Sequence, residues 1–384
     1  MEGRARRPRS ALATVWILVV CAAVGTGIGL VVREVRSDDG GGPSPIRVRP
    51  AREGPQSPAG LWLFGATTVR LDPAALSDPR DVGFQGFGAV LGGEGTVYLY
   101  DPVTGRVGVI DATRNELAGK TSVPVEGGVS GDAAPVIAVQ GETLWLVTGP
   151  GRLTRYDVAT GGTIDVTLPT DVVSEAEVGG PPAPRATRVV ADDEAAWAVY
   201  ELAVVGNPSR TAVVRVARDG SITARAVLPD RVEGDRFEPQ AIARGDALSV
   251  VARDAVIALD PTTISVRDAF AVQGASLDLH SAAVVGGSLW SYDATSGALV
   301  AINPDNGSVR QRVTLVGGTP PRVLAPASIV GRDGTLWVRV RVGDPNTFEQ
   351  LVARVDARSG DVTGRFSAPP QLEVGEIAVS YAPR

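Results

Sequence analysis

The sequence predicts an all-β fold, a seven-bladed β-propeller, from a strand pattern, a turn pattern and their spacing. The strand pattern is a short apolar strand that carries an aromatic residue in six of its seven copies. Its tryptophans are Trp62, Trp145, Trp197, Trp290 and Trp337, and Tyr98 and Ser249 take the equivalent place in the other two copies. Trp290 and Trp337 are 47 residues apart, and a period of roughly 40–50 residues is typical of propeller blades.

A polar turn follows each of these strands. The seven turns are LDPAALSD (71–78), IDATRNE (110–116), YDVATGG (156–162), ARDGS (217–221), LDPTTIS (259–265), INPDNGS (302–308) and VDARSGD (355–361). Asp and Asn side chains bond their own main chain in such turns, and Gly accepts a positive φ. Each turn therefore predicts a tight connection between two strands of one blade.

A strand of small apolar residues precedes every aromatic strand except the first. The six strands are 88–92, 136–140, 188–192, 241–245, 282–286 and 328–332. A seventh copy, EIAVS (376–380), lies near the C-terminus instead. We therefore expect the last strand to complete the blade that LWLF (61–64) begins, which closes the ring and leaves no free sheet edge.

Residues 144–169 carry a recognisable repeat, LWLVTGPGRLTRYDVATGGTIDVTLP. This stretch resembles the repeat of the YVTN and streptogramin (virginiamycin B) lyase-like propellers, and residues 100–111 and 289–309 match it too. The resemblance spans residues 60–384 and implies a propeller fold. The lyase of that family needs paired histidines and an acid around magnesium, whereas this chain has one histidine, His280. The resemblance therefore implies that the lyase site is not retained.

The N-terminal region predicts a membrane anchor. Residues 11–32 are uncharged and long enough for the roughly 20 helical residues that a bilayer core requires. Arg4, Arg6, Arg7 and Arg9 precede this run, so the positive-inside rule puts a short basic tail, residues 1–10, in the cytoplasm. A cleaved signal peptide is one alternative, but its apolar core would be shorter, about 7–15 residues. A lipoprotein signal is the other, but it would have a small residue before Cys21, where this chain has Val20.

Two features of the anchor complete the domain plan. Gly25 and Gly29 form a GxxxG pair, which allows close helix–helix contact. Residues 33–59 are rich in Gly, Pro and charge and predict a disordered linker. Residues 60–384 would then form an extracellular propeller, anchored as a single-pass protein in the cell membrane. Because nearly all basic residues are Arg, with Lys120 the only lysine, a high-GC bacterial source is expected.

Charge and cysteine content exclude some functions. Residues 1–58 hold nine Arg and five acids, which leaves 28 basic and 38 acidic residues for the remainder, a net charge of −10. Such a domain repels phosphate backbones, so no nucleic-acid partner is predicted. Cys21, inside the anchor, is the only cysteine, so the propeller has neither a disulfide nor a thiol nucleophile.

The candidate contact residues lie in the connections between blades. Three long connections, 169–186, 228–238 and 316–325, are expected on one face, because loops on a rigid scaffold commonly carry recognition. The candidates in or beside such connections are Arg231, Arg236, Phe237, His280 and Arg322. No catalytic residue, metal ligand or cofactor is predicted.

The predicted function is a non-catalytic binding or scaffolding module for a protein, a peptide or a cell-envelope ligand. One alternative is a lyase- or hydrolase-like propeller enzyme that uses carboxylates on the loop face. The other is a sensor ectodomain that signals through a membrane partner, because the roughly ten cytoplasmic residues are too few for a signalling domain.

Overall fold

The computed structural model divides the chain into two units, residues 1–41 and 42–384. It describes residues 58–65, 68–81, 89–92, 95–126, 136–174, 181–203, 210–229, 239–252, 254–277, 282–293, 295–316, 328–344, 347–368 and 376–381. The expected membrane segment (11–32), with Gly25 and Gly29, and linker residues 33–57 lie outside these ranges. Within the ranges, no helix is long and apolar enough to cross a membrane.

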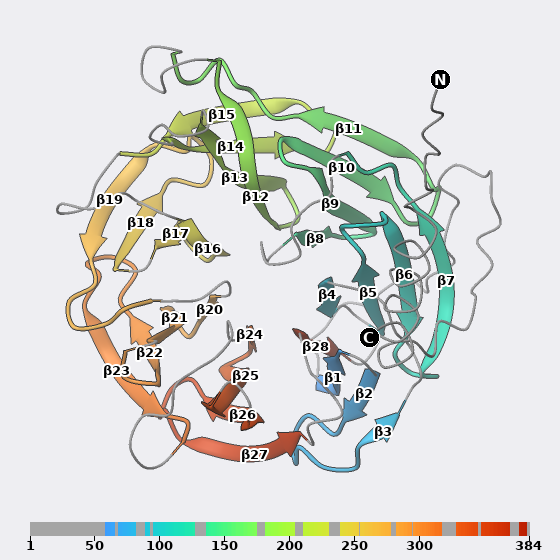
Figure 1. The fold of residues 1–384 in the computed structure, drawn as a ribbon, viewed down its shortest axis with the longest axis vertical. Coiled ribbons are helices and arrows are strands. Elements are labelled where there is room, and N and C mark those ends of the chain that lie inside the picture. The colour runs from blue at the N-terminus through green and yellow to red at the C-terminus, as the bar shows by residue number, and fades with distance from the viewer. Residues whose placement is uncertain are drawn as a thin grey trace, which may run out of the picture. The chain divides into compact units, whose positions relative to one another are not determined.

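The described part of residues 42–384 forms seven antiparallel sheets of four strands each. Figure 1 shows the sheets arranged as a ring around a central axis, with one strand of each sheet innermost. We number these sheets blades 1 to 7 in chain order. The all-β, seven-bladed propeller predicted from the sequence is thereby confirmed.

From the centre outward, the strands of the first three blades have these bounds. Blade 1 contains β28 (Glu376–Tyr381), β1 (Pro58–Phe64), β2 (Thr68–Leu71) and β3 (Arg80–Asp81); blade 2 contains β4 (Ala89–Gly92), β5 (Thr96–Tyr100), β6 (Arg106–Asp111) and β7 (Glu116–Ser122); blade 3 contains β8 (Ile137–Gln140), β9 (Thr143–Gly149), β10 (Arg152–Asp157) and β11 (Thr163–Thr167).

The other four blades follow the same order. Blade 4 contains β12 (Ala183–Ala191), β13 (Ala195–Ala203), β14 (Arg210–Ala217) and β15 (Ile222–Val227); blade 5 contains β16 (Pro239–Arg244), β17 (Leu248–Ala252), β18 (Ala255–Leu259) and β19 (Val266–Ala271); blade 6 contains β20 (Ala283–Val285), β21 (Ser288–Asp293), β22 (Ala298–Ile302) and β23 (Val309–Thr314); blade 7 contains β24 (Ser328–Arg332), β25 (Thr335–Asp344), β26 (Thr347–Asp356) and β27 (Val362–Ala368).

The ring is closed by the two ends of the propeller chain. Strand β28 pairs antiparallel with β1, as the sequence predicts, so blade 1 combines the first and last strands. The indole nitrogen of Trp62 donates to the buried hydroxyl of Ser380 at 2.8 Å. A Cβ atom at Gly92 in β4 would overlap the carbonyl of Val379 in β28, so the closing contact between blades 1 and 2 depends on glycine at this position.

The repeated tryptophans are structural. All five are at most 2% exposed, and their indole N–H groups have hydrogen-bond acceptors, as buried indoles normally do. Trp197 in blade 4 donates to the carbonyl of Pro261 in blade 5 at 2.7 Å. Trp337 in blade 7 donates to the carbonyl of Pro73 in blade 1 at 3.0 Å. Two of the repeated tryptophans thus join neighbouring blades.

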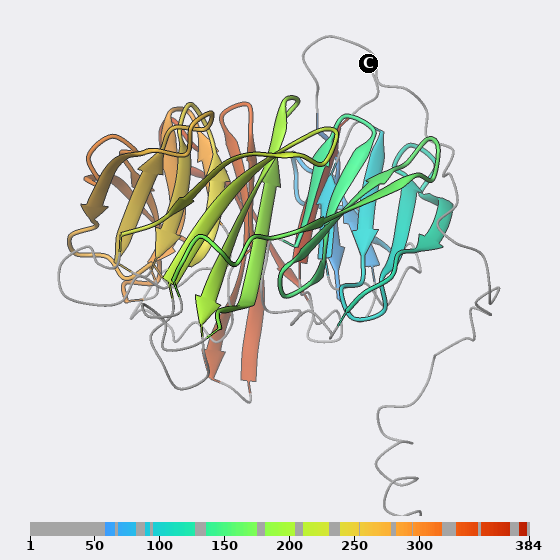
Figure 2. The same ribbon diagram turned by 90° about the horizontal axis from the view of Figure 1, so that it is seen from above.

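The ring has two different ends, and Figure 2 shows them above and below the strands. We call one end the turn face: it carries the turns that follow the inner strands and those that precede the outer strands. The other end, the loop face, carries the connections from each outer strand to the next inner strand and the turns between second and third strands. Because every blade has the same antiparallel strand order, the outer-to-inner connections all lie at one end, as predicted.

Candidate functional site

The sequence-predicted contact residues belong to loop-face connections. Arg231, Arg236 and Phe237 lie between β15 and β16, His280 between β19 and β20, and Arg322 between β23 and β24. All five lie outside the described residues, so their roles stay predictions. The strand ends that flank them are described, and these ends form the candidate site.

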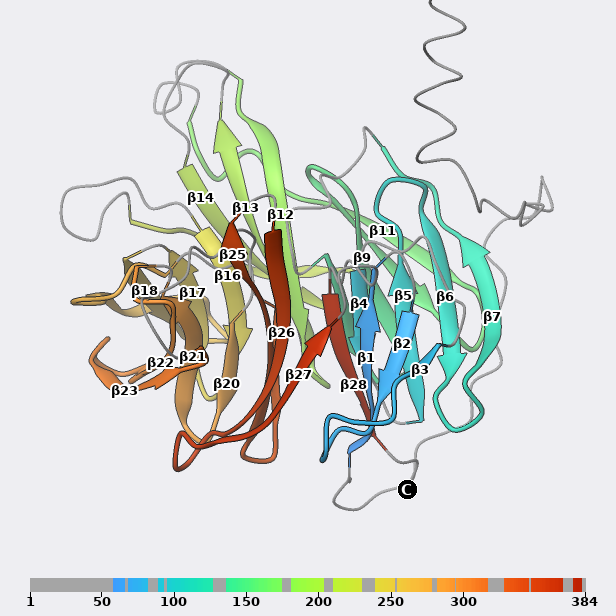
Figure 3. The same cartoon turned by 60° about the horizontal axis from the view of Figure 1, so that its bottom comes forward.

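Two blades extend further than their neighbours at the loop face. Strands β25 and β26 are ten residues long, and β12 and β13 are nine. The pairing of β25 with β26 continues to Asp344 and Thr347, and that of β12 with β13 reaches Ala183 and Ala203. In Figure 2 the green hairpin of blade 4 and the red hairpin of blade 7 project beyond the other blades on the same side, and Figure 3 also shows the projection of the green hairpin.

The two long hairpins bury polar side chains. Arg188 in β12 is 7% exposed; burial lowers its pKa, and the nearby Glu201 acts in the opposite direction. Arg339 in β25 is 4% exposed. Gln350 in β26 is fully buried, and neither polar atom of its carboxamide has a hydrogen-bond partner among the residues that the structure describes. Burying such a group typically costs about 1–3 kcal/mol, so the buried carboxamide of Gln350 lowers the stability of blade 7 near the loop face.

One aspartate organises the connection that contains His280. Asp293, at the end of β21, has a 1% exposed side chain. Its Oδ1 accepts the backbone N–H of Ser276 at 2.9 Å, and its Oδ2 accepts Arg312 Nη1 at 2.7 Å. Burial alone would raise the pKa of Asp293, but the hydrogen bonds from Ser296, Ser276 and Arg312 lower it overall. The carboxylate thus holds the chain at Ser276, and the next residue, Leu277, forms an antiparallel β-bridge with Asp293. Leu277 precedes His280 by three residues in the sequence.

Ion pairs hold two more connections at the loop face. Arg152 at the start of β10 binds both Glu126, after β7, and Asp165 in β11. Arg225 in β15 binds Asp171, after β11, at 2.7 Å. These pairs are partly exposed, so each stabilises the fold by at most about 1 kcal/mol. Their positions restrain the bases of the connections from blade 2 to blade 3 and from blade 3 to blade 4.

The inner strands around the axis consist mostly of small apolar residues. Examples are AVLG in β4, IAVQ in β8, AVV in β20 and SIVGR in β24. A Cβ at Gly331 in β24 would press against Val285 in β20, so the inner strands are closely packed. Among the described residues, no group of three His, Cys, Asp or Glu side chains could hold a metal ion.

Sequence reasoning missed the long hairpins. Residues 338–342, VRVRV, alternate apolar and basic side chains before a GDPN turn. That period of two followed by a turn is typical of a long hairpin and was the signal available. The burial of Gln350 had no such signal, because it depends on strands that pack against blade 7.

Comparison with known proteins supports the fold. No protein-family model and no curated protein matches the chain. Among solved structures, apo AztD from Citrobacter koseri is similar over 85% of this chain and 99% of its own, with 11% identity and a TM-score of 0.52. BamB from Moraxella catarrhalis, with 11% identity, covers 80% of this chain and 87% of its own at a TM-score of 0.44. At such identities the likeness to AztD concerns the fold alone, and the score for BamB is too low to carry any argument.

Proposed function

We propose that the chain is a non-catalytic binding or scaffolding module, in which the loop face of a rigid propeller recognises a protein, a peptide or a cell-envelope polymer. The observation that carries the proposal is the pair of long hairpins, β12–β13 and β25–β26, on the face that also bears all outer-to-inner connections. A rigid scaffold with variable loops at one end is a common design for recognition.

The polar groups of the long hairpins support this assignment. A natural core normally satisfies its buried polar atoms, and departures from that rule are expected at functional sites rather than in the scaffold. Gln350 is such a departure, and it lies in one of the two projecting hairpins. Recognition by the loop face requires a rigid surface, whereas catalysis would require a reactive centre.

The proposal includes the location expected from the sequence. Residues 11–32 would anchor the chain in a bacterial cell membrane with the propeller outside, and the repeats would belong to the YVTN-like group that they resemble. Protease added to intact cells then removes the propeller and leaves residues 1–32 in the membrane. Complete protection of the propeller would overturn this topology.

The binding role is tested by cross-linking the full-length chain on intact cells of its source and identifying captured partners by mass spectrometry. Two loop-face variants are compared: residues 341–350 replaced by a two-residue turn, and residues 228–238 replaced by Gly-Ser. A matched turn-face variant replaces residues 304–307 by Gly-Ser. We expect one reproducible envelope partner that both loop-face variants lose and the turn-face variant keeps.

Two outcomes would contradict loop-face binding. If the loop-face and turn-face variants lose the partner equally, general misfolding explains the loss and the loop face has no special role. If nothing specific is captured, a propeller enzyme with a transient small substrate becomes the better reading.

A further inference from the structure

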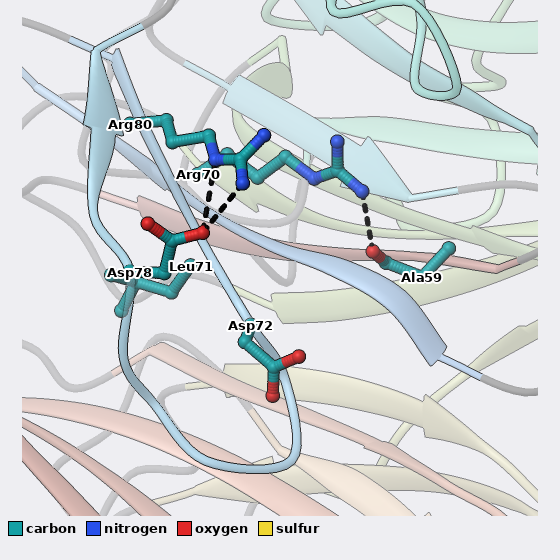
Figure 4. Close-up of a pocket in the computed structure, with 6 residues that line it drawn as sticks. All are labelled: Ala59, Arg70, Leu71, Asp72, Asp78 and Arg80. Atoms are coloured by element: carbon teal, nitrogen blue, oxygen red, sulfur yellow. Dashed lines mark hydrogen bonds and ion pairs between the residues drawn. The ribbon is translucent and has the colours of Figure 1, made fainter.

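A polar pocket lies on the turn face of blade 1, at the end of the ring opposite the proposed recognition surface. It is lined by Ala59, Arg70, Leu71, Asp72, Asp78 and Arg80 and has a volume of about 150 Å³. Figure 4 shows Arg80 beside Asp78, Arg70 reaching toward Ala59, and Asp72 at the start of the turn that joins β2 to β3. This pocket is separate from the loop-face function.

The pocket is explained by comparison with the same turn in blade 5. Residues 71–77 (LDPAALS) and 259–265 (LDPTTIS) have equivalent sequences and equivalent hydrogen bonds. The amide of Asp72 donates to Ser77 O, and that of Asp260 donates to Ser265 O, both at 2.9 Å. In each turn the aspartate Oδ1 accepts two backbone amides. The two turns therefore share one backbone design.

The turns differ in what happens to the second carboxylate oxygen. In blade 5, one residue, Val266, separates Ser265 from Arg267, whose Nη2 donates to Asp260 Oδ2 at 2.7 Å. In blade 1, Asp78 and Pro79 lengthen the turn by one residue before Arg80. Arg80 then binds Asp78 at 2.7 Å instead of Asp72. Among the described residues no hydrogen bond reaches Oδ2 of Asp72, and Asp72 is one of the residues that line the pocket.

The positive side of the pocket is also held in place. Arg70 is half-buried and donates to two neutral acceptors, Asn115 Oδ1 at 2.7 Å and Ala59 O at 2.6 Å. Its guanidinium lies 5.7 Å from the Trp62 ring centroid, and Gly60 leaves room for it, since a Cβ there would be 2.7 Å from Arg70 Nε. Burial, and then repulsion from Arg80, lowers the pKa of Arg70.

We propose that this pocket binds a small zwitterion of the α-amino-acid type, with its ammonium group on Asp72 and its carboxylate on the side of Arg70 and Arg80. The charge arrangement selects this class of ligand. A simple anion would meet Asp72 and Asp78, and a simple cation would meet Arg70 and Arg80, whereas a zwitterion complements both sides. The volume suits a ligand the size of a small amino acid.

Binding is tested by saturation-transfer NMR on the full-length chain with three probes of similar size. L-alanine carries both charges, propionate only the carboxylate, and ethylammonium only the ammonium. For so few atoms on a partly open site, we expect a Kd of about 1 mM for L-alanine. Each single-charge probe should bind about tenfold more weakly, because a charge-assisted hydrogen bond is lost. Equal binding of all three probes, or no saturable signal from L-alanine, would overturn the proposal.

Variants separate the pocket from the turn itself. Asp72→Asn keeps an oxygen to cap the turn but removes the charge, so L-alanine should bind about tenfold more weakly. The matched variant Asp260→Asn makes the same change in blade 5 and should leave binding unchanged. Indistinguishable binding by these two variants would contradict the assignment.

A third variant fills the pocket from within. Replacing Asp78-Pro79 by a single Val copies the spacing of blade 5, so Arg80 should pair with Asp72 as Arg267 pairs with Asp260. L-alanine binding should then disappear while the thermal unfolding midpoint is maintained. Retained binding in a folded variant would show that Asp72 does not hold the ligand.

Discussion

The two faces of the ring differ in how regular their connections are. At the turn face, polar atoms close short connections and join blades, as Trp337 does by donating to Pro73 O. Near the loop face, the strands differ in length between blades, and within the described part of the chain nothing pairs with the buried carboxamide of Gln350. The comparison teaches that the turn face contributes stability and closure, whereas the loop face varies from blade to blade around fixed anchor points.

The largest expected effect is at the turn-face closure. Gly92→Ala places a Cβ against the backbone carbonyl of Val379, which cannot move without disturbing the pairing of β28 with β1. We expect a loss of about 3 kcal/mol in the free energy of unfolding and a clear fall in the thermal midpoint of the full-length chain. The control is Gly162→Ala, where the nearest atom is the Thr160 hydroxyl at 3.3 Å. Equal midpoints for the two variants would refute the role of Gly92.

An intermediate effect is expected at the loop-face anchor Asp293. Asp293→Asn keeps an oxygen for the Ser276 amide but loses the ion pair with Arg312. At neutral pH we expect a cost of about 1–3 kcal/mol, measured by denaturant unfolding. The connection that carries His280 should also exchange its amide hydrogens faster.

The pH dependence of this anchor follows from the direction of its pKa shift. The folded pKa of Asp293 is lowered, so its stabilisation is complete above the unfolded value of about 4 and is lost as the pH falls through the folded value. The difference in stability between the parent and Asp293→Asn should therefore shrink below about pH 4. A constant difference down to the lowest pH at which both proteins fold would contradict this account.

The smallest effect tests the contrast between the faces directly. Gln350→Leu removes an unpartnered carboxamide at the loop face and should stabilise the fold by about 1 kcal/mol. Gln140→Leu removes the acceptor of the Trp145 indole N–H, 3.1 Å away at the turn face. It should destabilise the fold by about 1 kcal/mol, because a buried indole N–H loses its acceptor, although the Nε2 of Gln140, which has no partner among the described residues, is removed too. Thermal midpoints that shift in the same direction for both variants would remove the distinction drawn here.

Much of the scaffold was predictable because its signals are local. The aromatic strand, the Asp- and Gly-rich turn and the inner strand of small residues recur often enough to count seven blades. The place of residues 376–380 also followed, because an inner strand was missing only before residue 61. The candidate site was predictable only as a face: long connections were expected at one end, but the hairpin of β25 and β26 was missed.

The sequence by itself determined the repeat, the number of blades and the closure of the ring, since each rests on residues that are near one another in the chain or on a simple count of strands. Only the tertiary structure decided which polar groups are satisfied. Trp337 and Pro73 are 264 residues apart, and Gln350 is buried by neighbouring strands. The single extra residue before Arg80 has a visible consequence only beside the equivalent turn of blade 5. Burial and hydrogen-bond partners depend on the packing of distant segments, and no local pattern encodes that packing.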